Sequence, residues 1–139
     1  MKTSTVNAHF TNGMSFDIEI GGYKITVDAG KEVGGQGLGP GPKSLMLASL
    51  AGCTGMDVVS ILNKMRIKFD DLKIEVEGNI TEDHPKHFDH MHIKYIFRGK
   101  DIPVEKVNSA ISLSQEKYCG VSFNYRMAMK ITSELIIEE

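Results

Sequence analysis

Hydrophobic and polar residues alternate along the first part of the chain, as they do in half-buried β-strands. Phe and Ile alternate with Ser, Asp and Glu over residues 15–20, and residues 23–27 repeat the alternation after the turn Gly21-Gly22. A further turn signal, Asn12-Gly13, precedes the first of these stretches. Residues 4–28 are therefore predicted to form three short antiparallel strands.

A long apolar segment runs from Pro42 to about Arg66. Proline suits the first turn of a helix, where its missing N–H group costs nothing. The apolar residues of the segment occupy most of the circumference of a helix: Leu45, Met46, Leu47, Leu50, Ala51, Met56, Val58, Val59, Ile61, Leu62 and Met65. A helix with this pattern is buried on nearly all sides. We therefore expect sheets wrapped around it and a second copy of the chain to complete its burial.

The rest of the chain alternates between strand and helix patterns. Strands are predicted at about 71–80 and 90–97, and a last strand at about 127–137. Between them a second helix is predicted to start near Pro103, with Asp101 as its cap and with an apolar face made of Val104, Val107, Ile111 and Tyr118. These elements predict one α+β domain over residues 1–139, in which antiparallel sheets surround a long buried central helix.

A glycine-rich connection joins the first strands to the long helix, from Gly30 to Pro42. Its glycines resemble those of a phosphate-binding loop, but Lys43-Ser44 follows a proline rather than the glycine that such a loop requires. A mobile loop beside a functional site is the interpretation that we favour over a nucleotide cradle.

Composition narrows the class of protein. The chain has 139 residues, of which 41% are hydrophobic and 24% charged, as in a soluble globular protein. Its formal net charge of −2 gives no reason to expect binding to nucleic acid. We expect no apolar run that spans a membrane and, from residues 1–5, no secretion signal. Two cysteines are too few for a disulfide scaffold, so free thiols in the cytoplasm are expected.

The two cysteines occupy different positions on the predicted helices. Cys53 lies inside the long helix between Gly52 and Gly55, and glycine inside a helix costs roughly 0.5–1 kcal/mol relative to alanine. We infer that something approaches the backbone closely there. Cys119 ends the second helix before Gly120, and the negative end of a helix disfavours a thiolate. Cys53 is thus the better nucleophile and Cys119 the better resolving thiol, although free cysteines are commonly just small core side chains.

Two stretches around these cysteines resemble the OsmC/Ohr family, and most of all its YhfA-like branch. They read Gly39-Pro-Gly-Pro-Lys-Ser-Leu-Met-Leu-Ala-Ser-Leu-Ala-Gly-Cys53-Thr-Gly-Met-Asp-Val-Val and Ser114-Gln-Glu-Lys-Tyr-Cys119-Gly-Val-Ser. The resemblance implies an intertwined α+β homodimer without a cofactor, in which the two cysteines meet near the subunit interface. It also implies reduction of small hydrophobic organic peroxides: Cys53 becomes a sulfenic acid, Cys119 condenses with it to a disulfide, and an external dithiol reduces that disulfide.

The chain departs from the family pattern in one respect. Family peroxidases have an arginine on the N-terminal strands and a glutamate at the start of the central helix, which orient the reactive thiol. Here the first arginine is Arg66, and the helix starts with Lys43-Ser44. Lys43 and Arg126 are the candidate cations that would stabilise a thiolate, and we favour Arg126 because it follows the second cysteine. Neither reproduces a guanidinium held by a carboxylate.

Other side chains near the cysteines carry weaker signals. Met46 and Met56 flank Cys53 at helical spacings and could form a soft pocket, although plain core packing is the interpretation that we favour. Tyr118 could donate a hydrogen bond into the site. Asp57 lies one turn beyond Cys53, and we expect it to accept a hydrogen bond from the backbone or from a partner subunit.

The histidine-rich stretch at residues 84–92 is a candidate metal site. Zinc needs three or four ligands converging in a tetrahedron. His90 and His92 share one face of a strand, whereas His84 and His87 fall in the turn around Pro85. A surface turn is therefore the preferred interpretation.

Two functions fit this sequence. The first is a thiol-dependent hydroperoxide reductase that acts through Cys53 and Cys119. The second is a non-catalytic protein that holds a small hydrophobic ligand at the dimer interface, which the missing arginine and carboxylate favour. Thiols within disulfide reach, with Cα atoms below roughly 7 Å apart, favour the first.

Overall fold

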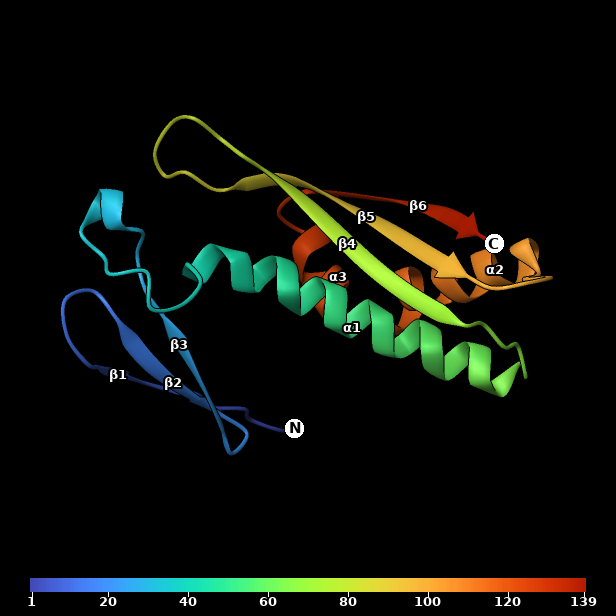
Figure 1. Ribbon diagram of the computed structural model, residues 1–139, viewed down its shortest axis with the longest axis horizontal. Helices are drawn as coiled ribbons and strands as arrows, with labels where there is room; N and C mark the ends of the chain where they lie inside the picture. The colour runs from blue at the N-terminus through green and yellow to red at the C-terminus, as the bar shows by residue number, and fades with distance from the viewer. The chain divides into compact units, whose positions relative to one another are not determined.

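The computed structural model describes all of residues 1–139 (Figure 1). Contacts within the chain divide it into two compact units, Met1–Met46 and Leu47–Glu139. Each unit contains a three-stranded sheet of its own. A single domain over the whole chain stays a prediction.

The N-terminal unit contains β1 (Asn7–Phe10), β2 (Phe16–Ile20) and β3 (Tyr23–Val27). The strands pair in the order β1-β2-β3, and both pairs are antiparallel. Gly21 and Gly22 form the tight turn between β2 and β3, and both have positive φ angles of 53° and 85°, which glycine adopts without strain. The prediction of three short antiparallel strands is confirmed.

The glycine-rich connection after β3 contains a short 3₁₀ turn, η1 (Lys31–Val33), and is organised by one carboxylate. Asp28 is buried, and its oxygens accept backbone N–H groups from Ala29 at 2.7 Å, Gln36 at 3.0 Å and Leu38 at 3.1 Å. The N–H group of Leu38 is the largest cause of a lowered Asp28 pKa. Two of the N–H groups that a phosphate would need from this loop are therefore already bound to the chain's own carboxylate.

The long helix α1 (Pro42–Lys64) is continuous through both glycines. Only one stripe of it is buried within a single chain, at i, i+4 spacing: Leu50, Thr54, Val58 and Leu62. The prediction of burial on nearly all sides is wrong for one subunit, since Met56 on another face is 76% exposed. A Cβ atom on Gly55 would come within 2.9 Å of Ile74, whereas one on Gly52 would meet nothing within 4 Å. The inferred close approach is therefore real at Gly55 only.

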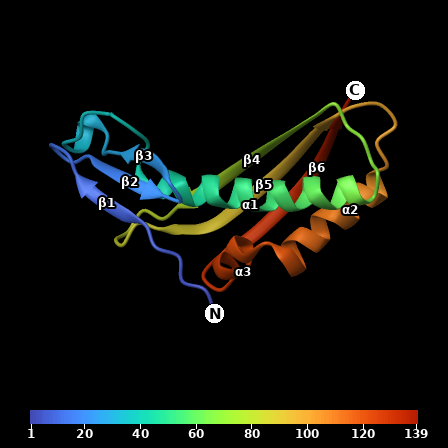
Figure 2. The same cartoon turned by 90° about the horizontal axis from the view of Figure 1, so that it is seen from below.

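The sheet of the C-terminal unit contains β4 (Asp71–Ile80), β5 (Phe88–Arg98) and β6 (Lys130–Glu138) in the order β4-β5-β6. β4 and β5 are antiparallel, as predicted, but β5 and β6 are parallel. A parallel pair needs a long crossover, and the helical segment between β5 and β6 provides it. Alternate residues of β5 are buried on one face, to which α1 and the crossover helices pack (Figure 2): Met91, Ile93, Tyr95 and Phe97.

The crossover has three helical parts: α2 (Val104–Leu113), the π-helical turn η2 (Ser114–Tyr118) and α3 (Gly120–Arg126). Three predictions were wrong here. Pro103 rather than Asp101 is the N-cap of α2, and no side chain caps it. Tyr118 is exposed, because the π-helical turn changes the phase of the predicted apolar face, and Val104 is exposed at the first residue of α2. The helix α3 was missed, so the last strand begins at Lys130 rather than at 127.

By length and composition alone, α1 is sufficient to cross a membrane, with 23 residues and a mean hydropathy of 1.7. The expectation that no apolar run reaches this length is therefore wrong. This is a weak indication of a membrane span, because the core helix of a soluble protein satisfies the same criterion. Within the single chain, 22% of this apolar window of α1 is buried.

Candidate functional site: two thiols and a carboxylate

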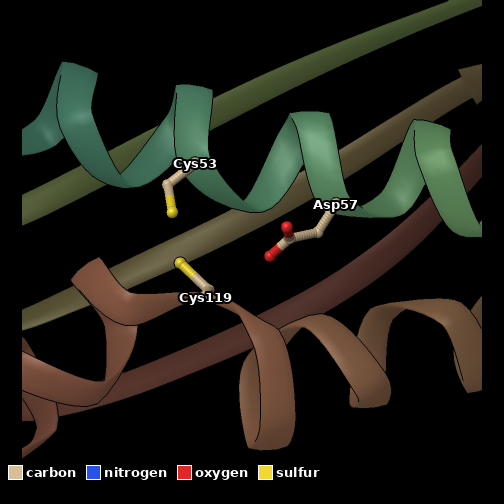
Figure 3. A group of neighbouring side chains, drawn as sticks. All are labelled: Cys53, Asp57 and Cys119. Atoms are coloured by element: carbon tan, nitrogen blue, oxygen red, sulfur yellow. The ribbon is translucent and has the colours of Figure 1, made fainter. Parts of the chain in front are cut away.

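Cys53 and Cys119 lie together on the helical face of the C-terminal unit. Cys53 comes from the middle of α1 and Cys119 from the junction of η2 and α3 (Figure 3). Their sulfur atoms and a carboxylate oxygen of Asp57 all lie within 4.8 Å of one another. Both cysteines are free thiols. A disulfide requires a sulfur–sulfur distance near 2.0 Å, so a modest movement would join the pair.

Cys119 is held in place by its own backbone setting. It is the N-cap of α3, and its sulfur accepts the backbone N–H of Ser122 at 3.3 Å. The prediction that this cysteine experiences only the negative end of a helix is wrong, because a new helix begins at the same residue. Its thiolate is nevertheless disfavoured, since burial, opposed in part by the Ser122 N–H group, raises the pKa of Cys119 from 9.0 to about 11.

The two thiols interact directly. A hydrogen bond with Cys53 adds to the raised pKa of Cys119, as expected when the Cys119 S–H group donates to the Cys53 sulfur. The negative charge of Asp57 acts in the same direction. Cys53 is half-buried, whereas Cys119 is only 3% exposed. The more accessible sulfur is thus the one that receives a hydrogen bond.

A buried polar network lies beneath the thiol pair. The hydroxyl of Thr54, the residue after Cys53, lies 2.6 Å from the Tyr95 hydroxyl and 2.9 Å from that of Ser114. The Gln115 side chain donates to Thr54 at 3.0 Å and to Tyr95 at 2.9 Å. The Ser114 hydroxyl donates to Asp57 at 3.0 Å. The network therefore joins α1, β5 and η2 around the site, and it fixes the Asp57 carboxylate.

A second branch of the network reaches Arg126. Ser122 donates its hydroxyl to the Gln115 side chain at 2.8 Å, and Arg126 donates to the Ser122 hydroxyl at 2.9 Å and to the Gln115 carbonyl. Arg126 therefore touches the residue whose N–H group binds the Cys119 sulfur. Its guanidinium is engaged by these oxygens and makes no hydrogen bond to either thiol.

The other predicted side chains lie in different places. Lys43 and Met46 belong to the N-terminal unit, and α1 does not break at the glycines, as Lys43 would need in order to approach Cys53. Met56 lies in an open groove of about 1,040 Å³ between α1 and β4, which does not include Cys53. Tyr118 lines a cavity of about 380 Å³ with Asp57, and another of about 290 Å³ with Cys119 and Arg126.

Sequence reasoning missed the residues of the network. Thr54 looked like a helix residue and Tyr95 like a buried strand residue, and both descriptions are accurate but incomplete. The available signal was the polar character of Thr54 and Ser114 in otherwise apolar surroundings, because buried hydroxyls need partners. Asp57 was singled out, and within the chain its carboxylate accepts a hydrogen bond from the Ser114 side chain rather than from the backbone. A contact with a second subunit stays a prediction.

The possible metal-binding residues fall into two sets. Cys53, Asp57 and Cys119 offer three donor atoms, one fewer than a closed structural zinc site requires. The histidines do not converge: His87 contacts the Pro85 carbonyl in the turn, whereas His90 and His92 each lie 2.7 Å from the Thr132 hydroxyl. Three donors are also what an open zinc site uses, so the expectation of no metal at this cluster stays a prediction.

The chain thus combines an α+β fold with two neighbouring free thiols on its helical face. The family model of OsmC-like proteins matches residues 34–134. The chain belongs to the OsmC family and is placed in its YhfA-like branch by a curated relative, Protein YhfA of Escherichia coli K12. The two are 36% identical over 93 residues, which is 67% of this chain and 69% of the relative.

Solved structures agree with this assignment. A hypothetical protein from Aquifex aeolicus is 32% identical, with a TM-score of 0.84 over all of both chains. The organic hydroperoxide resistance protein OhrB of Bacillus subtilis has a TM-score of 0.65 at 22% identity, over 96% of this chain and 98% of that one. The second likeness concerns the fold alone.

Proposed function

We propose that the protein is a thiol-dependent peroxidase that reduces organic hydroperoxides. The observation that carries this proposal is the meeting of two free thiols, one half-buried and one buried, with their sulfur atoms within 4.8 Å. A solved structure that shares this fold is described as an organic hydroperoxide resistance protein, OhrB. A stress-defence role in the cytoplasm follows from the same proposal.

The reaction needs only the two thiols and an external reductant. The Cys53 thiolate attacks the terminal oxygen of the hydroperoxide, the O–O bond breaks, and the alcohol leaves with a proton. Cys53 is now a sulfenic acid. Cys119 attacks its sulfur, and water leaves as the disulfide forms. An external dithiol then reduces the disulfide and restores both thiols.

A small hydrophobic substrate fits the surroundings of the site. A cavity of about 380 Å³ beside Asp57 has four largely apolar lining side chains, Ile61, Met65, Leu113 and Tyr118, together with the polar Ser60 and Lys64. Neither cysteine lines it, so a substrate bound there would reach the thiols past Asp57. An alkyl or aryl group of a hydroperoxide would bury apolar surface there. In this proposal Met46 and Met56 are parts of apolar packing rather than substrate contacts.

A homodimer completes the proposal. The groove between α1 and β4 is lined mainly by apolar and small residues, and its exposed Met56 belongs to the helix that the sequence predicts to be covered. A second copy of the chain is the occupant that would bury this groove. The contact would have to bury more than roughly 1,000 Å² to be specific.

In this proposal Arg126 activates Cys53 only indirectly, through Ser122 and Cys119. Arg126 binds Ser122, and the Ser122 N–H group binds the Cys119 sulfur. We propose that this chain of contacts keeps the Cys119 thiol in position to donate to Cys53. Lys43 would act only across the boundary between the two units, and it is the weaker candidate.

A non-catalytic ligand-binding protein is the second candidate, and the large apolar groove favours it. Titration of free thiols before and after one equivalent of cumene hydroperoxide separates the two functions. The peroxidase loses both thiols and regains them with dithiothreitol. A Cys119→Ser variant should lose its remaining thiol, and a Cys53→Ser variant should keep it. Thiols that are unchanged in the wild type would reject the peroxidase.

A further inference from the structure

Disulfide formation at this site requires the removal of the proton of the Cys119 thiol. Cys119 must attack as a thiolate, but its pKa is raised to about 11 by burial. At pH 7 only about one molecule in ten thousand would hold that thiolate unaided. A base within reach of the Cys119 sulfur would remove this obstacle.

Asp57 is the one carboxylate in that position. It lies one helical turn after Cys53 on α1, and its side chain points toward both sulfur atoms (Figure 3). A carboxylate oxygen is within 4.8 Å of each of them. That separation allows proton transfer through one water molecule or after a small closure. No salt bridge neutralises this carboxylate.

The polar network holds this base in place. Ser114 donates its hydroxyl to one Asp57 oxygen, and Thr54 links the same hydroxyl to Tyr95. A carboxylate that was needed only to fill space on a helix would not require three buried hydroxyls behind it. The contacts orient the carboxylate while leaving its charge uncancelled.

We propose that Asp57 is the general base and then the general acid of disulfide formation. This inference rests on the proposed function. Asp57 accepts the proton of the Cys119 thiol as that sulfur attacks the sulfur of the Cys53 sulfenic acid. The S–O bond of the sulfenic acid breaks, and Asp57 returns the proton to the departing hydroxide. One S–S bond and one water molecule form, and Asp57 is left unchanged overall.

The other titratable groups around Cys119 do not compete for this role. They are Cys53 on α1, Tyr95 on β5 and Tyr125 on α3, with Arg126 as the nearby cation. The exposed side chains Glu116, Lys117 and Tyr118 of η2 also line a cavity with Cys119, on the solvent side. Burial raises the pKa of Tyr95 and of Tyr125 above 10, so both tyrosines stay protonated at neutral pH. Cys53 is consumed as the sulfenic acid before the step begins.

The charge of Asp57 and its action as a base predict opposite effects of Asp57→Asn on the rate of disulfide formation. Its charge alone disfavours the Cys119 thiolate, so removal of the charge would speed disulfide formation. A base that accepts the proton makes Asp57→Asn slower instead. The direction of the change therefore separates the proposed role from a merely structural or electrostatic one.

The first measurement avoids peroxide. Ellman's reagent labels the more exposed Cys53, and attack by Cys119 then releases a second thionitrobenzoate, which is followed at 412 nm. We expect this second release to slow roughly a hundredfold in Asp57→Asn at pH 7. It should recover about tenfold for each pH unit, while the wild-type rate changes little. Asp57→Glu should recover part of the rate, and Asp89→Asn, an exposed change on β5, is the matched control.

The second measurement repeats the comparison with one equivalent of cumene hydroperoxide and traps sulfenic acid with dimedone. Asp57→Asn should form the Cys53 sulfenic acid at the wild-type rate and accumulate it. A second release in Asp57→Asn that equals or exceeds the wild-type rate would overturn the inference. If Ellman's reagent gives the expected slowing but hydroperoxide oxidises neither protein, the peroxidase proposal fails and the role of Asp57 as base to Cys119 stands.

Discussion

The two faces of β5 use polar residues in different ways. On the helical face, Tyr95 is fully buried and bonds to Thr54 and Gln115. On the opposite face, the neighbouring Lys94 lies 3.6 Å from both Glu75 and Glu77 and stays in contact with solvent. A buried polar group that loses its partner costs about 1–3 kcal/mol, whereas an exposed ion pair contributes about 0–1 kcal/mol. Function is therefore expected on the face where polar groups are few and fully bonded.

Cys53→Ser should have the largest effect of all the variants that compare the two faces of β5. Peroxide consumption with a dithiol should be lost, because the only other thiol, Cys119, is buried. His92→Gln, on the opposite face of β5, should keep the wild-type rate. A coupled assay that follows dithiol oxidation provides the measurement. Equal rates in Cys53→Ser and wild type would remove Cys53 from the mechanism.

Met56→Glu tests the exposed side of α1 against its buried stripe. A charge in the apolar groove should convert a dimer into monomers, because burial of an unpaired carboxylate is unfavourable. Light scattering at micromolar concentration measures the mass. Lys73→Glu, an exposed change on β4 outside the groove residues, is the control. A wild-type protein that is already monomeric would contradict the expected dimer.

Tyr95→Phe and Lys94→Met compare adjacent residues on the two faces. Loss of the Tyr95 hydroxyl leaves Thr54 and Gln115 short of a partner and should lower the free energy of unfolding by about 1–3 kcal/mol. Lys94→Met should change it by less than about 1 kcal/mol. Urea denaturation of both variants gives the two values. Equal losses would show that the buried network is no more costly to break than the surface ion pairs.

Alkaline pH should also distinguish Cys119 from Lys94 by the pH at which each loses its contribution to stability. The folded-state pKa of Cys119 is raised from 9.0 to about 11, so its contribution to stability is present below pH 9 and is lost as pH rises toward 11. Lys94 also has a raised pKa, chiefly because of the charge on Glu77, but its contribution is lost only above 10.5. Urea midpoints between pH 8 and pH 10 should therefore fall less in Cys119→Ser than in wild type, while Lys94→Met should follow the wild type.

Asp28→Asn should have the smallest effect on the thiol site, since Asp28 belongs to the N-terminal unit and β5 to the C-terminal unit. The lowered pKa of Asp28 means that its contribution to stability is present above the ordinary value of 3.8 and is lost as pH falls through the lower folded value. The amide form should loosen the N–H groups of Gln36 and Leu38. Faster hydrogen exchange at these two amides, with unchanged exchange in β5, would show it.

Much of the fold could be predicted from the sequence, because local patterns determine it. Alternation located the strands at 71–80 and 16–20, and Pro42 marked the start of α1. The helix α3 was missed because Gly120 after Cys119 resembles the end of a helix, although here it is the first residue of the next one. A glycine can follow the last residue of one helix or begin the next helix, and only the tertiary contacts distinguish these two cases.

The candidate site was predictable only in part. The two cysteines were identified by their motifs, and the structure brings them together. The polar network was not identified, because Thr54 meets partners 41 and 60 residues further along the chain. No periodicity in the sequence records such long-range pairs. The role of Arg126 stays a prediction, since its contacts to Ser122 and Gln115 reach the thiols only indirectly.

The π-helical turn at Ser114–Tyr118 makes the site depend on residue count as well as on residue type. Its backbone bond runs from the Cys119 N–H group to the Ser114 carbonyl, five residues back. Deletion of Glu116 or Lys117 from this turn would restore an ordinary helix and turn everything after it by about 100°. The chain would keep every cysteine, hydroxyl and carboxylate of the site, yet Cys119 would face away from Cys53. A one-residue change of length could therefore silence the thiol pair without altering any side chain of it.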